Sequence, residues 1–221
     1  FYLRPHDGKK LPPFEPGQFL TFQLDHPDEI KQLIRCYSLS DSPNHPDYYR
    51  VTIKRVPPPP NEGGVPPGLS SNFFHDSIME GDILDVKAPS GHFFLDTAKQ
   101  SPVVLIGGGV GLTPVLSMLN WIAESESKRE TYFFYGVTNS NDHAMKEHLK
   151  QIDIERENIH LHVCYSRPEE GDLKGEDYHH QGRISVNLFE SILPNKNFDF
   201  YLCGPPPMMK AVVSGLEEWG V

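Results

Sequence analysis

The fold of this chain is decided by the stretch Val103-Val104-Leu105-Ile106-Gly107-Gly108-Gly109-Val110-Gly111-Leu112-Thr113-Pro114. A short apolar run that ends in glycines predicts a strand buried on both faces, as in a parallel sheet. Apolar residues then recur at helical spacing, at Val115, Leu116, Met118, Leu119 and Ile122. We therefore expect a strand, a glycine loop and a helix, with Thr113 as the helix N-cap and Pro114 as the first helical residue.

The predicted junction of strand, loop and helix suits a phosphate group. Free N–H groups and the positive end of the helix dipole meet there, and Gly109 and Gly111 leave room for a pyrophosphate to approach the backbone. The spacing Gly109-x-Gly111-x-x-Pro114 departs from the Rossmann pattern, which has a third glycine where this chain has proline. Glycines also form tight turns without any ligand, so both interpretations are open on this stretch alone.

Composition narrows the class of protein. The chain has 221 residues, of which 38% are hydrophobic, enough for one large or two modest domains with a real core. A net charge of −10 argues against a nucleic-acid partner, and the sequence contains no apolar run of membrane-spanning length. The cysteines Cys36, Cys164 and Cys203 are too widely spaced for a disulfide framework, a zinc site or an iron–sulfur site. We expect a cytoplasmic protein without metal ligands of its own.

Residues 1–98 are predicted to form an all-β, antiparallel Greek-key barrel. Short β-rich segments alternate with clusters of proline, glycine, asparagine and aspartate, which is typical of such barrels. The expected strands are Phe1–Leu3, Gln18–Leu24, Arg35–Leu39, Tyr48–Val56 and Ile83–Lys87. A short helix is expected over Asn72–Ile78, capped by the serines that follow Gly68.

Residues 99–221 are predicted to form an α/β domain with a doubly wound parallel sheet, because strands and helices alternate there. The expected strands are Val103–Ile106, Thr131–Val137, His160–Tyr165 and Phe198–Cys203, and the expected helices are Val115–Ala123, His143–Ile152, Val186–Leu193 and Pro207–Glu218. Ligands of such sheets bind at the carboxyl ends of the strands. We therefore expect one crevice formed by the loops Gly107–Gly111, Val137–Asn141, Tyr165–Pro168 and Cys203–Pro206.

Two segments of the barrel carry possible ligand-binding groups. In an extended strand Arg35, Tyr37 and Leu39 point to one face, and an arginine beside an aromatic plane can hold a phosphate and a flat ring together. The same residues also fit an ordinary strand with a surface arginine. Gly68–Ser71 can form a second anion site at a helix N-terminus, or simply a well-capped helix.

Taken together, the motifs resemble the ferredoxin–NADP reductase superfamily over essentially the whole chain. The matching segments are Arg35-x-Tyr37-Ser38 for the flavin, Gly68-x-x-Ser71 for the flavin pyrophosphate, and Gly109-x-Gly111-x-x-Pro114 and Cys203-Gly204-Pro205 for the nicotinamide nucleotide. The chain resembles in particular the reductase part of flavohaemoglobins and the reductases joined to a [2Fe–2S] ferredoxin domain. That likeness is carried by Tyr37–Asp41, Ser71-Asn72 and His143-Ala144-Met145.

The resemblance implies a role for each matching residue. Ser38 and Cys203 become the candidate catalytic residues, next to the flavin N5 and the nicotinamide respectively. The other implied FAD-binding residues are Arg35, Tyr37, Leu39, Gly68, Leu69, Ser70 and Ser71. The implied pyridine-nucleotide residues are Gly108, Gly109, Val110, Gly111, Leu112, Thr113, Gly204 and Pro205. Reductases of this superfamily usually continue to a terminal strand that this sequence does not reach, so we expect an open flavin face and weakened FAD retention.

The resemblance implies an FAD-dependent NAD(P)H oxidoreductase that passes hydride to bound FAD and then single electrons to a haem or [2Fe–2S] acceptor, in the same longer chain or another protein. A free flavin reductase and a non-catalytic nucleotide-sensing module are the alternatives. We expect NADH as the donor, because Val137–Asp142 contains no basic residue to bind the 2′-phosphate of NADPH. Arg167 is the basic residue that could reverse this preference.

Overall fold

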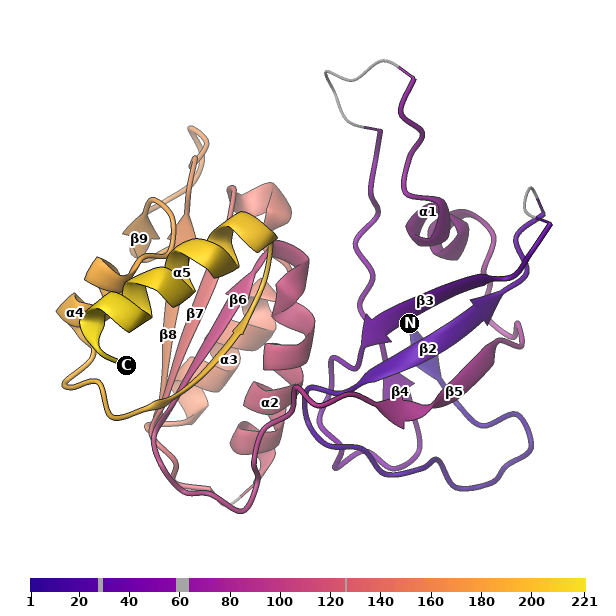
Figure 1. The fold of residues 1–221 in the computed structure, drawn as a ribbon, viewed down its shortest axis with the longest axis horizontal. Helices are drawn as coiled ribbons and strands as arrows, with labels where there is room; N and C mark the ends of the chain where they lie inside the picture. The colour runs from indigo at the N-terminus through magenta and orange to yellow at the C-terminus, as the bar shows by residue number, and fades with distance from the viewer. Residues whose placement is uncertain (28–29, 59–63, 126) are drawn as a thin grey trace.

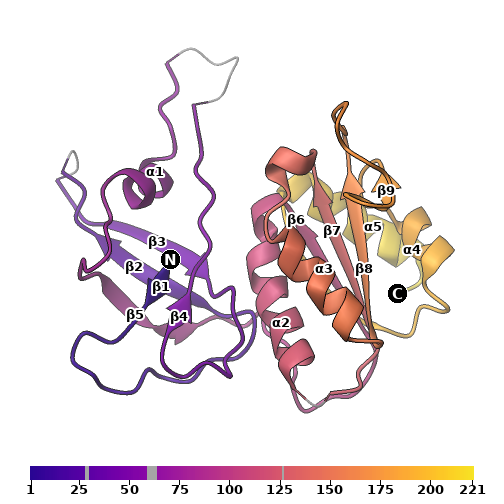
Figure 2. The same ribbon diagram turned by 180° about the vertical axis from the view of Figure 1, so that it is seen from behind.

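The computed structural model describes residues 1–27, 30–58, 64–125 and 127–221. Figure 1 shows two parts side by side, antiparallel sheets formed by the N-terminal part (residues 1–98) and a parallel sheet with helices formed by the C-terminal part (residues 99–221). Seen from behind in Figure 2, α2 (Leu112–Glu124) lies on the side of the C-terminal part that faces the N-terminal part. In the described part of the chain, no helix is both long and apolar enough to span a membrane.

The N-terminal part contains two antiparallel sheets. The first has the order β3-β2-β5, formed by Leu33–Ser38, Phe19–Leu24 and Asp85–Ser90, and the second pairs β1 (Tyr2–Leu3) with β4 (Tyr49–Arg50). Burial alternates along β2, so that Leu20, Phe22 and Leu24 point into the core while the residues between them are only partly covered. The short helix α1 (Leu69–Asp76) adds the fully buried Phe74 to this core. The predicted all-β organisation is confirmed.

The fourth predicted strand is much shorter than expected. Regular pairing stops after an isolated bridge between Leu39 and Val51 instead of continuing to Val56. The backbone carbonyls after Val51 instead accept hydrogen bonds from α1 and the residue before it. His75 Nε2 donates to the Ile53 carbonyl (2.9 Å), and Gly68 N donates to the Val56 carbonyl (3.0 Å). The predicted strand Ile83–Lys87 is likewise displaced to Asp85–Ser90, where it pairs with β2.

The C-terminal part is built on a five-stranded parallel sheet in the order β10-β6-β7-β8-β9. The strands are Asp199–Cys203, Val103–Gly108, Thr131–Val137, Ile159–Tyr165 and His180–Gln181. All six residues of β6 are buried, as its apolar sequence predicts. The strands β7, β8 and β9 follow one another on one side of β6, and β10 lies on its other side. The strand order therefore reverses between β6 and β10. The two-residue strand β9 was not predicted, because it is too short to show a pattern.

Helices cover both faces of this sheet (Figures 1 and 2). One face carries α2 and α3 (Lys146–Glu155), and the other carries α4 (Val186–Ile192) and α5 (Pro206–Trp219). The predicted doubly wound arrangement is therefore confirmed. The predicted start of the second helix, His143, is wrong by three residues, because Ser140–Asp142 form a 3-10 turn and Met145 adopts a left-handed backbone with φ 59°.

Two predicted helix caps are also wrong. A short 3-10 turn, Gly109–Gly111, runs straight into α2, so Gly111 is the N-cap and Leu112 the first helical residue. Thr113 lies inside the first turn, where its hydroxyl donates to the Val110 carbonyl (3.2 Å), and Pro114 follows it. The helix α1 begins after Gly68 with no side-chain cap.

The two parts are joined at Asp41. Its buried carboxylate pairs with Arg50 (3.1 Å) and accepts from the Tyr48 hydroxyl (3.0 Å), both in the N-terminal part. From α2, Asn120 Nδ2 donates to the same carboxylate (2.9 Å), and the Ser117 hydroxyl donates to the Asp41 carbonyl (2.7 Å). A charge-assisted network therefore crosses the boundary between the parts.

Replacement of Asp41 by asparagine is expected to lower the free energy of unfolding by about 2–4 kcal/mol, because the mostly buried Arg50 then loses its counter-charge. Urea unfolding followed by circular dichroism measures the change. Asp47→Asn, at an exposed position on the same loop, is the control and should leave stability within about 0.5 kcal/mol. Equal stability of the two variants would show that the Asp41 network does not hold the parts together.

Candidate functional site

The two flavin-like motifs of the sequence lie next to each other in the structure. Tyr37, on β3, and Ser70, in the first turn of α1, have hydroxyl oxygens 2.9 Å apart. The Tyr37 ring also packs edge-on against Phe22 and Phe74, with ring centroids 5.7 and 5.3 Å away. Packing and hydrogen bonding therefore bring together two segments that are separated by some thirty residues of sequence.

The remaining residues of the first motif differ in exposure. Arg35 is exposed on β3, and its guanidinium donates to the Ile34 carbonyl (2.8 Å) without an ion pair in the described residues. Ser38 is partly covered at the end of the strand, opposite Phe19. Leu39 is fully buried, so only its backbone can face a ligand. Arg35 is thus the group in this motif that is free to bind an anion.

The start of α1 offers backbone N–H groups. The first intrahelical bond runs from Asn72 N to the Gly68 carbonyl (3.0 Å), which leaves the amides of Leu69, Ser70 and Ser71 before it. The Ser71 hydroxyl donates to the Gly68 carbonyl (3.1 Å) and accepts from Val56 N (3.3 Å). The hydroxyl therefore holds the loop in shape, and the amides are what the loop presents to an anion.

The glycines that follow β6 have two different uses. A Cβ atom on Gly111 would lie 2.4 Å from the Cys203 carbonyl oxygen, and one on Gly108 would lie 2.4 Å from the Met208 sulfur. The loops after β6 and β10 therefore pack backbone to backbone at the point where the strand order reverses. Gly109 differs, because it has φ +53° and its Cβ direction meets nothing within 4 Å. Of these three glycines, it is Gly109 that leaves space for a ligand.

A cavity of about 250 Å³ lies between the two parts of the molecule. Thr52–Lys54 line it from the N-terminal part, and Gly109, Val110, Leu112, Thr113, Tyr135 and Asn141–Ala144 line it from the C-terminal part. Lys54 Nζ and Asp142 Oδ1 form an ion pair across the boundary at 2.6 Å. The hydrogen bond from Lys54 is the main reason why the pKa of Asp142 is lowered.

The four predicted loops meet in two pairs. Cys203, Gly204 and Pro205 follow β10 and lie against the glycine loop after β6, whereas Arg167, after β8, donates its backbone N–H to Thr138 after β7 (2.9 Å). Burial raises the pKa of Cys203, which keeps it a neutral thiol. The Arg167 side chain is exposed.

Acidic groups surround the pair of loops after β7 and β8. Glu169 accepts from Asn139 Nδ2 (2.9 Å), and Asp172 accepts from Ser140 N (3.4 Å). Hydrogen bonds from Ser140 first, and then from the backbone N–H of Glu169 (2.9 Å), lower the pKa of Asp172, so its carboxylate is ionised at neutral pH. The segment after β7 therefore faces negative charge.

Several cavity residues had no assigned role on sequence grounds. Thr52, Lys54 and Asp142 belong to no recognised motif, and their importance follows only from the way the two parts meet. His143 lies in a segment that carries the family likeness, yet its spacing alone indicates no chemistry.

One group of potential metal ligands is present in the described residues. Asp41, His45 and Glu124 bring ligand atoms within 4.8 Å of one another. Asp41 is already paired with Arg50 within the N-terminal part, and His45 with Glu124 across the boundary (3.0 Å), so these two pairs account for the group.

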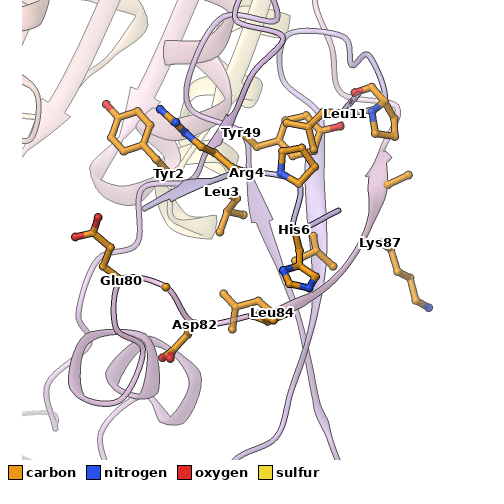
Figure 3. A pocket seen from close by; sticks show the side chains of 16 residues that line it. Tyr2, Leu3, Arg4, His6, Leu11, Tyr49, Glu80, Asp82, Leu84 and Lys87 are labelled. Atoms are coloured by element: carbon orange, nitrogen blue, oxygen red, sulfur yellow. Dashed lines mark hydrogen bonds between the residues drawn. The ribbon is translucent and has the colours of Figure 1, made fainter. Parts of the chain in front are cut away.

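A second, larger cavity of about 930 Å³ lies on the N-terminal part (Figure 3). Figure 3 shows Leu3 near the middle of the lining side chains, with Glu80 and Lys87 toward opposite sides. None of the predicted site residues lines this cavity. It is therefore separate from the motifs discussed above.

Comparison with known families defines the class of protein. Residues 5–95 match the oxidoreductase FAD-binding domain, and residues 105–214 match the oxidoreductase NAD-binding domain. The two matches coincide with the antiparallel and the parallel part of the fold. The chain is therefore a two-domain flavoprotein oxidoreductase that uses FAD and a nicotinamide nucleotide.

Individual relatives narrow this class. A flavohemoprotein of Halalkalibacterium halodurans is 42% identical over 221 residues, which is all of this chain and 53% of the relative. The flavohem-like FAD/NAD-binding domain of a nitric oxide dioxygenase from Vibrio cholerae superposes with a TM-score of 0.85 at 31% identity, covering all of this chain and 86% of that one. Phthalate dioxygenase reductase, which transfers electrons from pyridine nucleotides to [2Fe–2S], gives a TM-score of 0.71 at 28% identity over 99% of this chain and 59% of that one.

These comparisons identify the family and its extent. The chain belongs to the ferredoxin reductase-like family of FAD- and NAD-binding oxidoreductase domains, with flavohemoproteins among its relatives. It spans about half the length of the flavohemoproteins that it matches.

Alanine substitutions of Gly111 and Gly109 should distinguish a glycine that is needed for packing from one that leaves space for a ligand. Gly111→Ala is expected to lower the free energy of unfolding by about 3 kcal/mol, because the new Cβ meets a backbone carbonyl that cannot easily move. Gly109→Ala should cost only about 1 kcal/mol, since its positive φ is strained but the space is open. Guanidinium unfolding of both variants provides the comparison, and an equal or reversed order would contradict the close contact between the two loops.

Proposed function

We propose that the chain transfers hydride from NADH to bound FAD and then releases single electrons to a haem or [2Fe–2S] acceptor. The observation that carries this proposal is the cavity lined by both domains, with the glycine loop on one side and residues 52–54 on the other. Hydride transfer requires two cofactors to meet between the domains, and this cavity leaves room at the domain boundary, beside the glycine loop, for part of a dinucleotide.

We propose that the FAD is held by the two motifs joined at Tyr37 and Ser70. The exposed Arg35 guanidinium and the amides at the start of α1 suit the pyrophosphate, since both donate hydrogen bonds to anions. Tyr37 offers its ring to the isoalloxazine, and Ser38 is assigned to the neighbourhood of the flavin N5. When bound, FAD supplies the hydride acceptor and the one-electron donor.

The pyridine nucleotide is assigned to the region between the glycine loop and β10. Gly109 gives open space, and the N-terminus of α2 provides the N–H groups and the favourable dipole that suit a pyrophosphate. Cys203 is assigned to the nicotinamide as a neutral thiol, which can shape and orient the ring without acting as a nucleophile. Gly204 and Pro205 are assigned to the nucleotide beside Cys203.

The proposed boundary between the two domains lies at residues 98 and 99, between the two family matches.

The electron acceptor is proposed from the relatives. The flavohemoproteins that the chain matches are about twice its length, which supports a haem globin domain as the acceptor, in the same longer polypeptide or as a separate protein. The likeness to phthalate dioxygenase reductase supports a [2Fe–2S] acceptor as the second candidate. The cytoplasmic location expected from the unpaired cysteines stays a prediction.

Anaerobic mixing of the FAD-loaded chain with NADH tests the proposed function. Loss of the flavin absorbance at about 450 nm, with the flavin still bound after gel filtration, is the expected result. Reduction of added flavin that does not stay bound would favour a free flavin reductase. Nucleotide binding without any loss of absorbance would favour a nucleotide-sensing module and overturn the proposal.

Arg35→Ala is expected to weaken FAD binding by roughly ten- to a hundredfold, because a charged contact to the pyrophosphate contributes a few kcal/mol. Flavin retained after gel filtration and the FAD dissociation constant are the measurements. Arg4→Ala removes an exposed arginine from the second cavity and serves as the matched control. Equal retention by the two variants would remove Arg35 from the FAD site.

NADH is expected to give a higher kcat/KM than NADPH with an artificial acceptor, because acidic groups surround the loops where a 2′-phosphate would lie. Glu169→Gln should raise the kcat/KM for NADPH and leave that for NADH nearly unchanged. Arg167→Ala is the complementary variant. A wild-type preference for NADPH that disappears in Arg167→Ala would overturn the prediction and assign Arg167 to the 2′-phosphate.

A further inference from the structure

His143 lies at the domain boundary in an aromatic setting. It is 9% exposed, and its ring packs edge-on against Tyr135 and Tyr165, with centroids 5.5 and 5.7 Å away. Its Nδ1 atom is 2.8 Å from the Tyr165 hydroxyl oxygen. One edge of the imidazole is therefore fixed by a buried hydrogen bond.

The other nitrogen of this ring lacks a partner. Among the residues that the structure describes, His143 Nε2 is the single buried side-chain nitrogen or oxygen without a hydrogen bond. An unsatisfied buried polar group lowers the stability of the folded state, so proteins rarely keep one without a use. The exception at this position requires an explanation.

The hydrogen bond to Tyr165 fixes which nitrogen carries the proton. The Tyr165 hydroxyl has no other acceptor in the described part of the chain, so it donates to Nδ1 and leaves the proton of the neutral ring on Nε2. Burial, reinforced by Lys146 and Lys150 and opposed by Asp177, lowers the pKa of His143 to about 4. At neutral pH the side chain is therefore an uncharged donor through Nε2–H.

His143 also lines the 250 Å³ cavity between the domains, together with Gly109 and Thr113 from the glycine loop and Lys54 from the FAD-binding domain. This volume is smaller than a typical ligand pocket, so it suits one portion of a dinucleotide rather than the whole molecule. Phosphate and ribose oxygens are the hydrogen-bond acceptors that such a portion would bring.

We propose that His143 Nε2–H donates a hydrogen bond to a phosphate or ribose oxygen of the pyridine nucleotide in this cavity. The inference rests on the proposed function, since it takes a pyridine nucleotide as the occupant. His143 is then a nucleotide-binding residue whose donor is held in place by Tyr165 before the ligand arrives, which reduces the ordering cost of binding.

Two substitutions of His143 distinguish the contribution of its Nε2 atom from that of its Nδ1 atom. Asparagine places a polar atom near Nδ1 and removes the group at Nε2, whereas glutamine reaches the Nε2 position with an N–H donor. Titration calorimetry of the FAD-loaded chain with NAD⁺ measures binding without any hydride transfer. We expect His143→Asn to weaken NAD⁺ binding about tenfold, and His143→Gln to stay within about threefold of the wild type.

Tyr165→Phe is the structural control. It removes the buried hydroxyl but keeps the aromatic ring and the Nε2 atom, so the melting temperature should fall while NAD⁺ affinity changes less than in His143→Asn. The ¹⁵N and ¹H signals of the wild-type imidazole give a second measurement, because Nε2–H should shift when NAD⁺ is added.

The outcomes distinguish the inference from the proposed function. A wild-type chain that does not bind NAD⁺ would contradict the proposed function itself. NAD⁺ binding by the wild type with equal affinity in His143→Asn, or with no change of the Nε2–H signal, would overturn only the role of His143.

Discussion

The buried carboxylate of Asp41 is the interaction on which the site depends, because it joins the two domains whose meeting creates the cavity. Arg50 balances its charge from one side, and Asn120 approaches it from α2 on the other. His148, on α3, donates to Asn120 Oδ1 (2.7 Å) and extends the network. A polar network whose hydrogen bonds are all satisfied fixes the position of the two domains relative to each other, since any shift would leave buried charge unpaired. The spacing of the two nucleotide-binding regions follows from it.

The four longer strands and the four helices of the parallel part could be predicted from its sequence, because β6 is a continuous apolar run and apolar residues of α2 repeat at helical spacing. The antiparallel part was less predictable, since its strands are short and compete with other hydrogen-bond partners. The backbone after Val51 illustrates this, because it bonds to α1 instead of extending the sheet. The starts of α2 and α3 were missed because a 3-10 turn and a left-handed Met145 follow from tertiary context rather than from local preference.

Candidate site residues that belong to a sequence motif could be predicted. Those that are brought together only where the two domains meet could not. The pairing of Tyr37 with Ser70 agrees with the grouping of the two flavin-like segments. The glycines, in contrast, share a residue type but differ in use, since Gly111 makes room for the protein's own backbone and Gly109 does not. Lys54 and Asp142 come from different domains, and their pairing cannot be inferred from spacing in either one.

The position of β10 next to β6 has a consequence for how the chain is made. Its register, from Asp199 with Val103 to Cys203 with Gly107, joins β6 to a strand that is made nearly a hundred residues later in the sequence. Until the ribosome has released β10, β6 has one open edge whose apolar residues and free backbone groups resemble an aggregation-prone sheet edge. The glycine loop after β6, which packs against the loop after β10, therefore matures late in synthesis, and nascent chains that stop before β10 should depend strongly on chaperones to remain in solution.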